Sequence, residues 1–134
     1  MESVAFASDG RLALQQSDVQ FRGHAIECRI NAEDPAKGFM PDAGTIETYV
    51  PPGGFGIRVD SHAFGGCTIP PQYDSLVAKI IAHAADRDEC TQRMLRALDE
   101  LWITGIKTNV SFFHAVLESA AFQHGSIGTD YLVT

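Results

Sequence analysis

An arginine directly after a glycine-rich turn is the residue of this sequence whose setting best suits chemistry. Residues 53–56 (GGFG) allow the backbone to reverse sharply, and the alternation after them predicts a short strand over 57–61. The strand would hold Arg58 on a stiff element, with its side chain directed away from those of Ile57 and Val59. A guanidinium held in this way is a permanent planar positive charge, which suits it to stabilise negative charge developing on an oxygen.

The residues near Arg58 also fit a plain structural role. Asp60 lies two positions further along the same strand, and Asp74 follows a rigid proline pair, so either carboxylate would serve as an ion-pair partner. Exposed pairs of this kind are common and contribute little to stability. On residue types alone, a surface arginine is the more frequent case, and the same holds for Glu27 and Arg29.

Three other chemistries do not fit the context of their residues. A phosphate-binding loop joins a strand to a helix, whereas residues 53–56 have strand-like sequence on both sides and predict a tight β connection. Residues 60–62 (DSH) cannot form a hydrolase triad, because neighbouring strand residues point to opposite faces, and no Gly-x-Ser-x-Gly motif occurs. The carboxylate pairs at 33–34 and 99–100 are expected to be solvated.

Composition places the chain among ordinary globular proteins. It has 134 residues, 45% of them hydrophobic and 20% charged, with a net charge of −7, which is enough sequence for one domain with a core. No basic cluster predicts nucleic-acid binding, and no apolar run reaches the roughly 20 residues that span a bilayer. The cysteines and histidines lack the spacing of metal sites, so free thiols in a reducing compartment and packed or surface histidines are expected. They are Cys28, Cys67, Cys90, His24, His62, His83, His114 and His124.

Alternating apolar and polar residues predict strands in the first two thirds of the chain. The clearest is 21–31, in which Cys28 and Ile30 share one face while Glu27 and Arg29 share the other. Further strands are expected at 44–50, 57–61 and 76–82, with a weaker one at 63–68.

The apolar period changes to about 3.6 residues in the last third, which predicts helices. Asp86 begins the first helix, with Glu89 three positions later in a capping-box arrangement, and Gly105 ends it. Its apolar stripe consists of Cys90, Met94, Leu95, Leu98, Leu101 and Trp102. Asn109 caps a second helix, which closes at 124–126. Its inward residues are Val110, Phe113, Val116, Leu117 and Ala120.

The order of these elements predicts the fold class. Strands first and helices last indicate an α+β fold, an antiparallel β-sheet with two or three helices packed on one side. Residues 1–18 are weakly patterned and are expected to be a tail or a remnant of a preceding domain, while 19–134 form the domain itself.

Four motifs, by their order and their gaps, resemble the C-terminal domain of biotin carboxylase. They are residues 23–35 (GHAIECRINAEDP), 52–58 (PGGFGIR), 70–79 (PPQYDSLVAK) and 105–109 (GIKTN). The resemblance extends over nearly the whole chain, from about residue 20 to its end. Together the motifs identify the family far more specifically than any one of them does.

The resemblance implies a reaction and a role for Arg58. Biotin carboxylases use ATP, Mg²⁺ or Mn²⁺ and bicarbonate to make carboxyphosphate, and they move CO2 to N1 of biotin on a carrier protein. The arginine at the position of Arg58 stabilises the enolate-like ureido oxygen that forms when N1 loses its proton, which is electrostatic stabilisation by a preorganised charge. Lysine would not replace it fully, because the planar fork is lost.

The resemblance also implies that the chain is one domain of a larger enzyme. The family's ATP, metal and bicarbonate residues match nothing here, so the fragment alone is expected to be inactive. Expected partners are the ATP-grasp and N-terminal domains of the same enzyme, a biotin carboxyl carrier protein, a carboxyltransferase and a second copy, with neither nucleic acid nor membrane. The parent would be cytoplasmic, or in the mitochondrial matrix if eukaryotic, and the acetyl-CoA carboxylase of fatty acid synthesis is one of several candidate parents.

A non-catalytic dimerisation or scaffold module that kept the fold is the alternative function. Arg87 falls where the family places an interface arginine, and His83 stands nearby where an aromatic residue is usual. The chain departs from the family at three further positions, namely Cys67, Gln72 and Thr104. These departures bear on the family's dimer contacts more than on its carboxylation chemistry.

Overall fold

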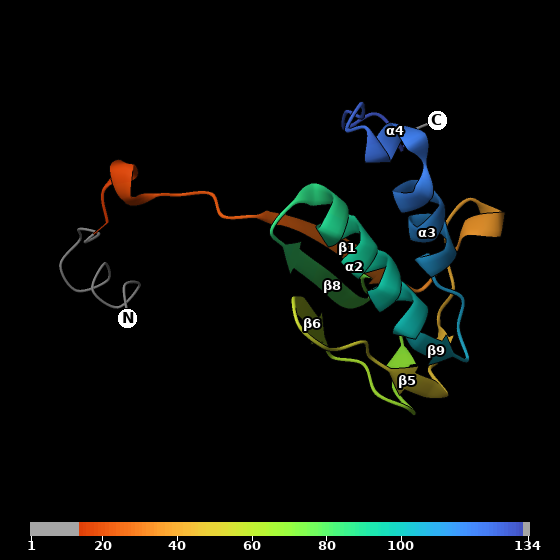
Figure 1. The fold of residues 1–134 in the computed structure, drawn as a ribbon. Helices are drawn as coiled ribbons and strands as arrows, with labels where there is room; N and C mark the ends of the chain where they lie inside the picture. The colour runs from red at the N-terminus through yellow and green to blue at the C-terminus, as the bar shows by residue number, and fades with distance from the viewer. Residues whose placement is uncertain (1–13, 133–134) are drawn as a thin grey trace.

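A computed structural model describes residues 14–132, and it arranges short strands and helices around one central sheet (Figure 1). The strands are β1 (His24–Asn31), β2 (Glu33–Asp34), β3 (Met40–Pro41), β4 (Gly44–Thr45), β5 (Thr48–Val50), β6 (Ile57–Ser61), β7 (Thr68–Ile69), β8 (Leu76–Ala84) and β9 (Trp102–Thr104). Within residues 14–132 the helices are η1 (Gln16–Asp18), η2 (Pro35–Lys37), α2 (Arg87–Glu100), α3 (Val110–Glu118) and α4 (Ala120–Gln123).

The central sheet is antiparallel, with β8 between β1 and β6. Its register places Glu27 and Arg58 on either side of Ile81, so these three side chains lie in one row across the sheet. The neighbouring row, Cys28 and Val59 on either side of Ile80, faces the opposite side. The predicted separation of apolar and charged faces is therefore confirmed on β1 and β6, whereas β8, predicted as a buried strand, places Ile81 in the row of Glu27 and Arg58.

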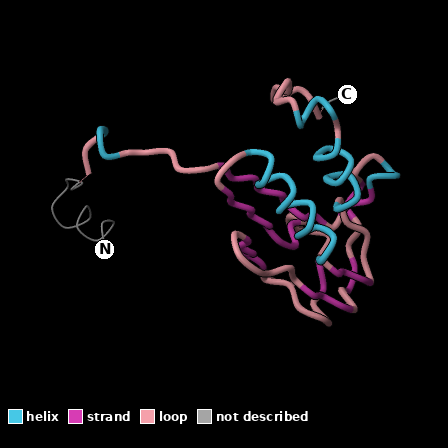
Figure 2. The backbone as a smooth tube through the Cα atoms, in the orientation of Figure 1, coloured by secondary structure: helices cyan, strands magenta, loops and turns pink. Residues whose placement is uncertain are grey.

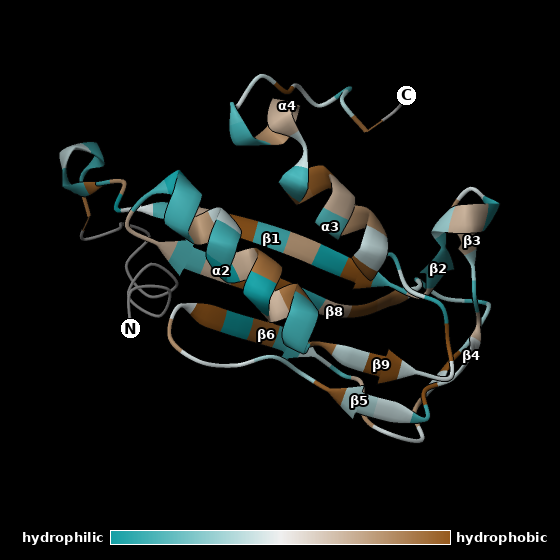
Figure 3. Ribbon diagram, turned by 45° about the vertical axis from the view of Figure 1, so that its right-hand side comes forward, coloured by the Kyte–Doolittle hydropathy of each residue, from teal (hydrophilic) through white to brown (hydrophobic). Residues whose placement is uncertain are grey.

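Helix α2 covers the apolar face of the sheet, and the main core lies between them (Figure 3). Ile80 and Met94 are fully buried there, and Leu117 of α3 joins the same cluster. Figure 2 shows the longer helices, α2 and α3, on one side of the strands. The predicted α+β fold with helices on one side of an antiparallel sheet is thus confirmed. In residues 14–132 we find no helix long and apolar enough to cross a membrane.

A second, smaller core interrupts the strand predicted at 44–50. Ile46 is fully buried against Ile69 and Val77, so the chain turns inward there instead of continuing straight. The backbone before it forms β4, which pairs with β7, and the backbone after it forms β5, which pairs with β9. One predicted strand is therefore two, in different strand pairs.

Helix α2 begins as predicted but ends five residues before Gly105. Asp86 Oδ1 accepts a hydrogen bond from the Glu89 amide at 2.8 Å and so caps the helix as predicted. Glu89 Oε2 accepts one at 3.3 Å from the amide of Ala85, the residue before the N-cap, and not from Asp86 as in a capping box. After Glu100 the chain becomes extended and forms β9, so the prediction that Leu101 and Trp102 continue the helix was wrong. Pairing with β5 supplies the backbone hydrogen bonds that the helix would otherwise have made.

The last helix is also shorter than predicted, because Ser119 breaks it into α3 and α4. The Ser119 hydroxyl oxygen accepts a hydrogen bond from the Phe122 amide at 3.2 Å and so caps α4. Ala120 is consequently exposed, contrary to its predicted inward position, whereas Leu117 is buried as expected.

Smaller boundary differences concern the other strands. β1 begins at His24 instead of residue 21, β7 occupies Thr68–Ile69 where the weaker strand was expected at 63–68, and β8 runs on to Ala84. β6 has the predicted bounds. Residues 1–13 lie outside the described part, and the predicted domain boundary after residue 18 stays a prediction. In Figure 1 the segment before β1 leads away from the sheet.

Candidate functional site

Arg58 projects from the face of the sheet that α2 leaves uncovered. Ile57 and Val59 pack toward the main core, so strand alternation turns the Arg58 side chain to the other side. The side chain is 75% exposed. The tight turn before β6 and the antiparallel pairing with β8 hold its backbone in place.

Asp60 is the partner of Arg58, as one of the two structural alternatives predicted. Arg58 Nε donates to Asp60 Oδ1 at 2.9 Å, and Arg58 Nη2 lies 2.9 Å from Asp60 Oδ2, which is a two-point contact between fork and carboxylate. This hydrogen bond raises the pKa of Arg58 above its ordinary value and lowers the pKa of the Asp60 carboxyl. Both groups are therefore charged at neutral pH.

The pairing leaves one edge of the guanidinium available. Asp60 occupies the edge formed by Nε and Nη2, whereas Nη1 and the outer hydrogen of Nη2 point elsewhere. That second edge can donate two parallel hydrogen bonds to an oxyanion. The arrangement is an oriented cation on a rigid strand, which is the requirement for stabilising a charge that develops nearby.

Further charged groups lie on the same face of the sheet. Lys79 stands directly across the strand pair from Asp60, and Arg29 stands on the other side of Lys79. Arg29 Nη2 lies 3.8 Å from Asp74 Oδ2, which brings the proline-containing loop toward this face. Glu27 contributes to the raised pKa of Arg58, after the larger effects of Asp60. We name these residues the charged face; they are Glu27, Arg29, Arg58, Asp60, Asp74 and Lys79.

A polar network holds the proline-containing loop against β1 and β2. Ser75 donates from Oγ to Glu33 Oε1 at 2.8 Å, and Asn31 donates from Nδ2 to the same oxygen at 3.0 Å. The Asp74 carboxylate accepts from the Leu76 amide at 2.9 Å. Glu33 is thus half-buried and bound by side chains, and the expected solvated pair at 33–34 is instead a structural link.

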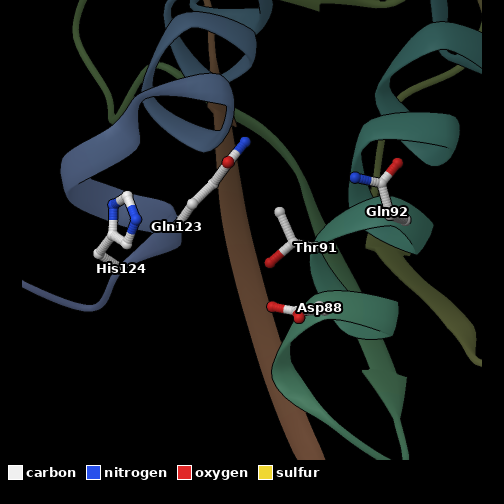
Figure 4. A pocket seen from close by; sticks show the side chains of 5 residues that line it. All are labelled: Asp88, Thr91, Gln92, Gln123 and His124. Carbon is white, nitrogen blue, oxygen red and sulfur yellow. The ribbon is translucent and has the colours of Figure 1, made fainter.

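A groove between the helices lies away from Arg58. It has a volume of about 400 Å³ between the start of α2 and the end of α4, on the helix-covered side of the molecule (Figure 4). Its lining residues are Asp88, Thr91, Gln92, Gln123 and His124. Because this groove and the charged face lie on opposite sides of the sheet, the groove is no part of the site at Arg58.

The residues predicted at a dimer contact lie close to this groove and to the end of β8. Arg87 Nη2 donates to the Phe122 carbonyl oxygen at 2.8 Å, and the guanidinium lies 4.6 Å from the centre of the Phe122 ring. Arg87 therefore links α2 to α4 within the chain. His83 is exposed, and its Nε2 lies 2.9 Å from the Arg22 carbonyl oxygen. A role for either in dimer formation stays a prediction.

The cysteines do not form a reactive centre with the charged face. Burial raises the pKa of Cys28 to about 12, and burial also raises the pKa of Cys90, so both thiols stay protonated at neutral pH. Cys67 is partly exposed, and the three are free thiols. In residues 14–132 no three His, Cys, Asp or Glu side chains lie together as a metal site.

Two arginines that no sequence motif singled out contact the turn before β6. Arg93 and Arg96 of α2 each have a carboxylate four residues away, Glu89 and Glu100 respectively, which is typical of a solvated helix face. In the structure both arginines also contact the turn at residues 53–56. The spacing of Arg93 and Arg96 on one helix face was the only signal in the sequence.

Comparisons with known proteins identify the family of this chain. Residues 27–134 match the family described as the biotin carboxylase C-terminal domain. Biotin carboxylase 1 of Bacillus subtilis is 51% identical over 133 residues, which are 99% of this chain and 30% of that protein. Biotin carboxylase of Pseudomonas aeruginosa is 51% identical over 131 residues, which are 98% of this chain and 29% of that protein.

Solved structures show the same fold. The biotin carboxylase domain of a thermophilic 2-oxoglutarate carboxylase, bound to bicarbonate, superposes with a TM-score of 0.92 at 45% identity. That match covers 97% of this chain and 29% of the other. The Hydrogenobacter thermophilus 2-oxoglutarate carboxylase domain, a dimer in complex with MgADP, ADP and bicarbonate, matches with the same values. The chain spans about 30% of the length of these relatives, and it belongs to the biotin carboxylase C-terminal domain family.

Proposed function

We propose that this chain supplies one wall of the site at which a biotin carboxylase carboxylates N1 of biotin, with Arg58 as its catalytic residue. The observation that carries the proposal is the free edge of the Arg58 guanidinium. Asp60 fixes the other edge on a rigid strand, and the side chain is 75% exposed on a face that no helix of the described residues covers. Such a cation is available to a substrate that approaches from another domain.

The chemistry of the reaction fits this group. When N1 of biotin loses its proton, negative charge spreads to the ureido oxygen, and a fork of two N–H donors stabilises that oxygen more than the neutral carbonyl. ATP and bicarbonate form carboxyphosphate and ADP, and N1 takes up the CO2 that carboxyphosphate releases together with phosphate. The N1 proton goes to a base outside this chain. Because Arg58 stays charged at every accessible pH, it stabilises the anion and does not remove the proton.

The remaining parts of the site belong to the rest of the enzyme in this proposal. The chain spans 30% of Biotin carboxylase 1, so residues for ATP, Mg²⁺ or Mn²⁺ and bicarbonate would come from the other part of such a protein. A structural relative holds MgADP and bicarbonate in its complete domain, which supports this division. Biotin would arrive on a carrier protein, and a carboxyltransferase would use the product. It follows that the chain alone does not cleave ATP.

The test is a chimera in which this chain replaces the matching 30% of Bacillus subtilis Biotin carboxylase 1. We expect Arg58→Ala to lower biotin-dependent turnover by about 10²–10³, because one preorganised donor to an oxyanion is lost. The KM for ATP stays unchanged, and Arg58→Lys recovers only part of the rate. Arg22→Ala removes an exposed arginine from the segment before β1 and serves as the matched control. Unchanged turnover in Arg58→Ala would remove Arg58 from the mechanism.

Dimer formation is the second candidate function, and the dimeric state of the Hydrogenobacter thermophilus relative favours it. The exposed His83 at the end of β8 is the residue through which this role can be tested. The two functions depend on different positions, because Arg58 lies near the start of β6 and His83 near the end of β8.

A further inference from the structure

We infer that Arg93 and Arg96 position Arg58 by holding the turn that precedes β6; we name this pair the arginine clamp. The inference rests on the proposed function, because it concerns the same catalytic residue. Both arginines lie on α2, on the other side of the sheet from Arg58. They reach the turn at residues 53–56 around the edge of the sheet, where β6 is the last strand.

Arg93 holds the end of the turn. Its Nη1 donates to the His83 carbonyl oxygen at 2.6 Å, and its guanidinium lies 5.1 Å from the centre of the Phe55 ring. The side chain is only 15% exposed, although it carries a full charge. Its remaining donors include one to Glu89 on the preceding helical turn, which fixes the direction of the guanidinium.

Arg96 holds the beginning of the turn. Both Nη1 and Nη2 point to the Gly53 carbonyl oxygen, at 3.4 and 3.3 Å. Nη1 also donates to Glu100 Oε1 at 2.6 Å, on the following helical turn. Each arginine of the clamp is therefore oriented by a carboxylate of its own helix. Arg93 contacts the turn through the Phe55 ring, and Arg96 contacts it through the Gly53 carbonyl oxygen.

Gly56 shows how closely the clamp and the turn fit. Its φ of 73° lies in the left-handed region, and a Cβ atom there would collide with Arg93 Nη1 and come within 2.5 Å of the His83 carbonyl oxygen. The Gly56 carbonyl oxygen in turn accepts from the His83 amide at 2.8 Å. Arg93 thus occupies the space that a side chain at Gly56 would fill. The backbone of His83 binds both Arg93, through its carbonyl oxygen, and Gly56, through its amide.

The turn is connected to Arg58 by one residue of strand. Arg58 is the second residue of β6, so a shift or rotation at Gly56 moves its backbone directly. β6 is an edge strand of five residues, so it pairs with β8 on one side only, and the turn at its start contributes to holding it in place. A displacement of about 1 Å in a positioning group is enough to lower a rate up to a hundredfold. The clamp therefore controls the position and orientation of the Arg58 guanidinium without touching the substrate.

The experiment uses the chimera with Bacillus subtilis Biotin carboxylase 1 and the variants Arg93→Ala, Arg96→Ala, Arg58→Ala and the double variant Arg58→Ala/Arg93→Ala. We expect Arg93→Ala to lower kcat for biotin-dependent turnover about tenfold to a hundredfold with an unchanged KM for ATP, and Arg96→Ala less. In the double variant, Arg93→Ala causes no further loss beyond Arg58→Ala, because it acts through Arg58. Gln92→Ala, one position earlier on α2 and exposed, is the matched control.

A second measurement does not depend on activity. Amide hydrogen exchange in the chimera reports on residues 53–57, where Arg93→Ala should accelerate exchange and Gln92→Ala should not. Unchanged exchange, or independent losses in the double variant, would overturn the clamp. If Arg58→Ala abolishes turnover while Arg93→Ala leaves kcat unchanged, the inference that the clamp positions Arg58 is wrong and the proposed function stands. If Arg58→Ala has no effect while the turn loosens in Arg93→Ala, the proposed function fails and the clamp is a purely structural device.

Discussion

Arg58 and Asp60 lie two residues apart on β6, so both side chains project from the same face of the strand and meet without a turn. Both are exposed, and an exposed ion pair adds little to the free energy of unfolding. The contact instead orients Arg58, because two hydrogen bonds fix the plane of its guanidinium. Replacement of Asp60 is therefore expected to change the rate of the reaction far more than the stability of the fold.

Asp60→Asn tests this separation in the chimera. An amide keeps one acceptor but loses the charge, and the pair is exposed, so we expect the free energy of unfolding to stay close to that of the wild-type chimera. Biotin-dependent turnover falls, although less than in Arg58→Ala, and Asp60→Glu retains more of it. Urea denaturation and steady-state kinetics measure the two effects. Equal turnover in Asp60→Asn and the wild-type chimera would show that the pair does not orient Arg58.

The pH dependence of the pair follows from the lowered pKa of Asp60. The carboxylate is stabilised in the folded chain, so its contribution is present above the ordinary aspartate pKa and disappears as the pH falls through the lowered value. The Asp60 carboxyl carbon should therefore titrate by NMR below an ordinary aspartate. In Arg58→Ala its titration should return toward the ordinary range.

At the scale of elements, Asn109 ties the end of β1 to the start of α3. Its Oδ1 accepts from the Asn31 amide at 2.9 Å, and its Nδ2 donates to the Arg29 carbonyl oxygen at 3.1 Å. The residue stands at the N-cap position, as predicted, but its side chain makes no capping hydrogen bond. Both polar atoms of the Asn109 side chain instead bind the backbone of β1. The register of β1 is irregular at Asn31, so backbone groups there need partners outside the strand pair.

Asn109→Ala should be costly for that reason. Asn109 is 5% exposed, and its removal leaves one backbone N–H and one backbone C=O of β1 without these partners. We expect the free energy of unfolding to fall by about 2–4 kcal/mol in urea denaturation. Glu118→Ala, an exposed position on α3, is the control and should change it by less than about 0.5 kcal/mol. A loss in Asn109→Ala no larger than in the control would mean that the link is not needed.

On the scale of the whole molecule, the sheet separates two surfaces with different expected roles. The charged face carries Arg58, and the helix-covered side carries the groove between α2 and α4. Arg87 is engaged with Phe122 within the chain, so its removal would loosen α4 as well as any interface. A test of dimer formation therefore needs a residue whose own contacts within the chain are few.

His83→Ala provides that test. If the chain forms dimers through the region around the end of β8, light scattering should show a molar mass that rises with concentration, and His83→Ala should weaken the association. His62→Ala removes an exposed histidine elsewhere and is the control. A constant monomer mass at every concentration would contradict the second candidate function and leave the proposal for Arg58 untouched.

Local patterns in the sequence predicted the elements that local physics sets. The bounds of β6 follow from alternation, and the N-cap of α2 follows from the Asp86 side chain that binds nearby backbone. The end of α2 could not be predicted in this way, because Leu101 and Trp102 continue the helical period. Pairing with β5, which lies far away in the sequence, decides that they leave the helix.

The sequence by itself determined the family, through the order of its motifs, and the place of Arg58 on an exposed face, through strand alternation. Only the tertiary structure decided which carboxylate pairs with Arg58, and that arginines of a distant helix hold the turn before it. The reason is physical. Alternation and capping act over a few residues, whereas the clamp joins positions about forty residues apart that come together only when α2 packs on the sheet.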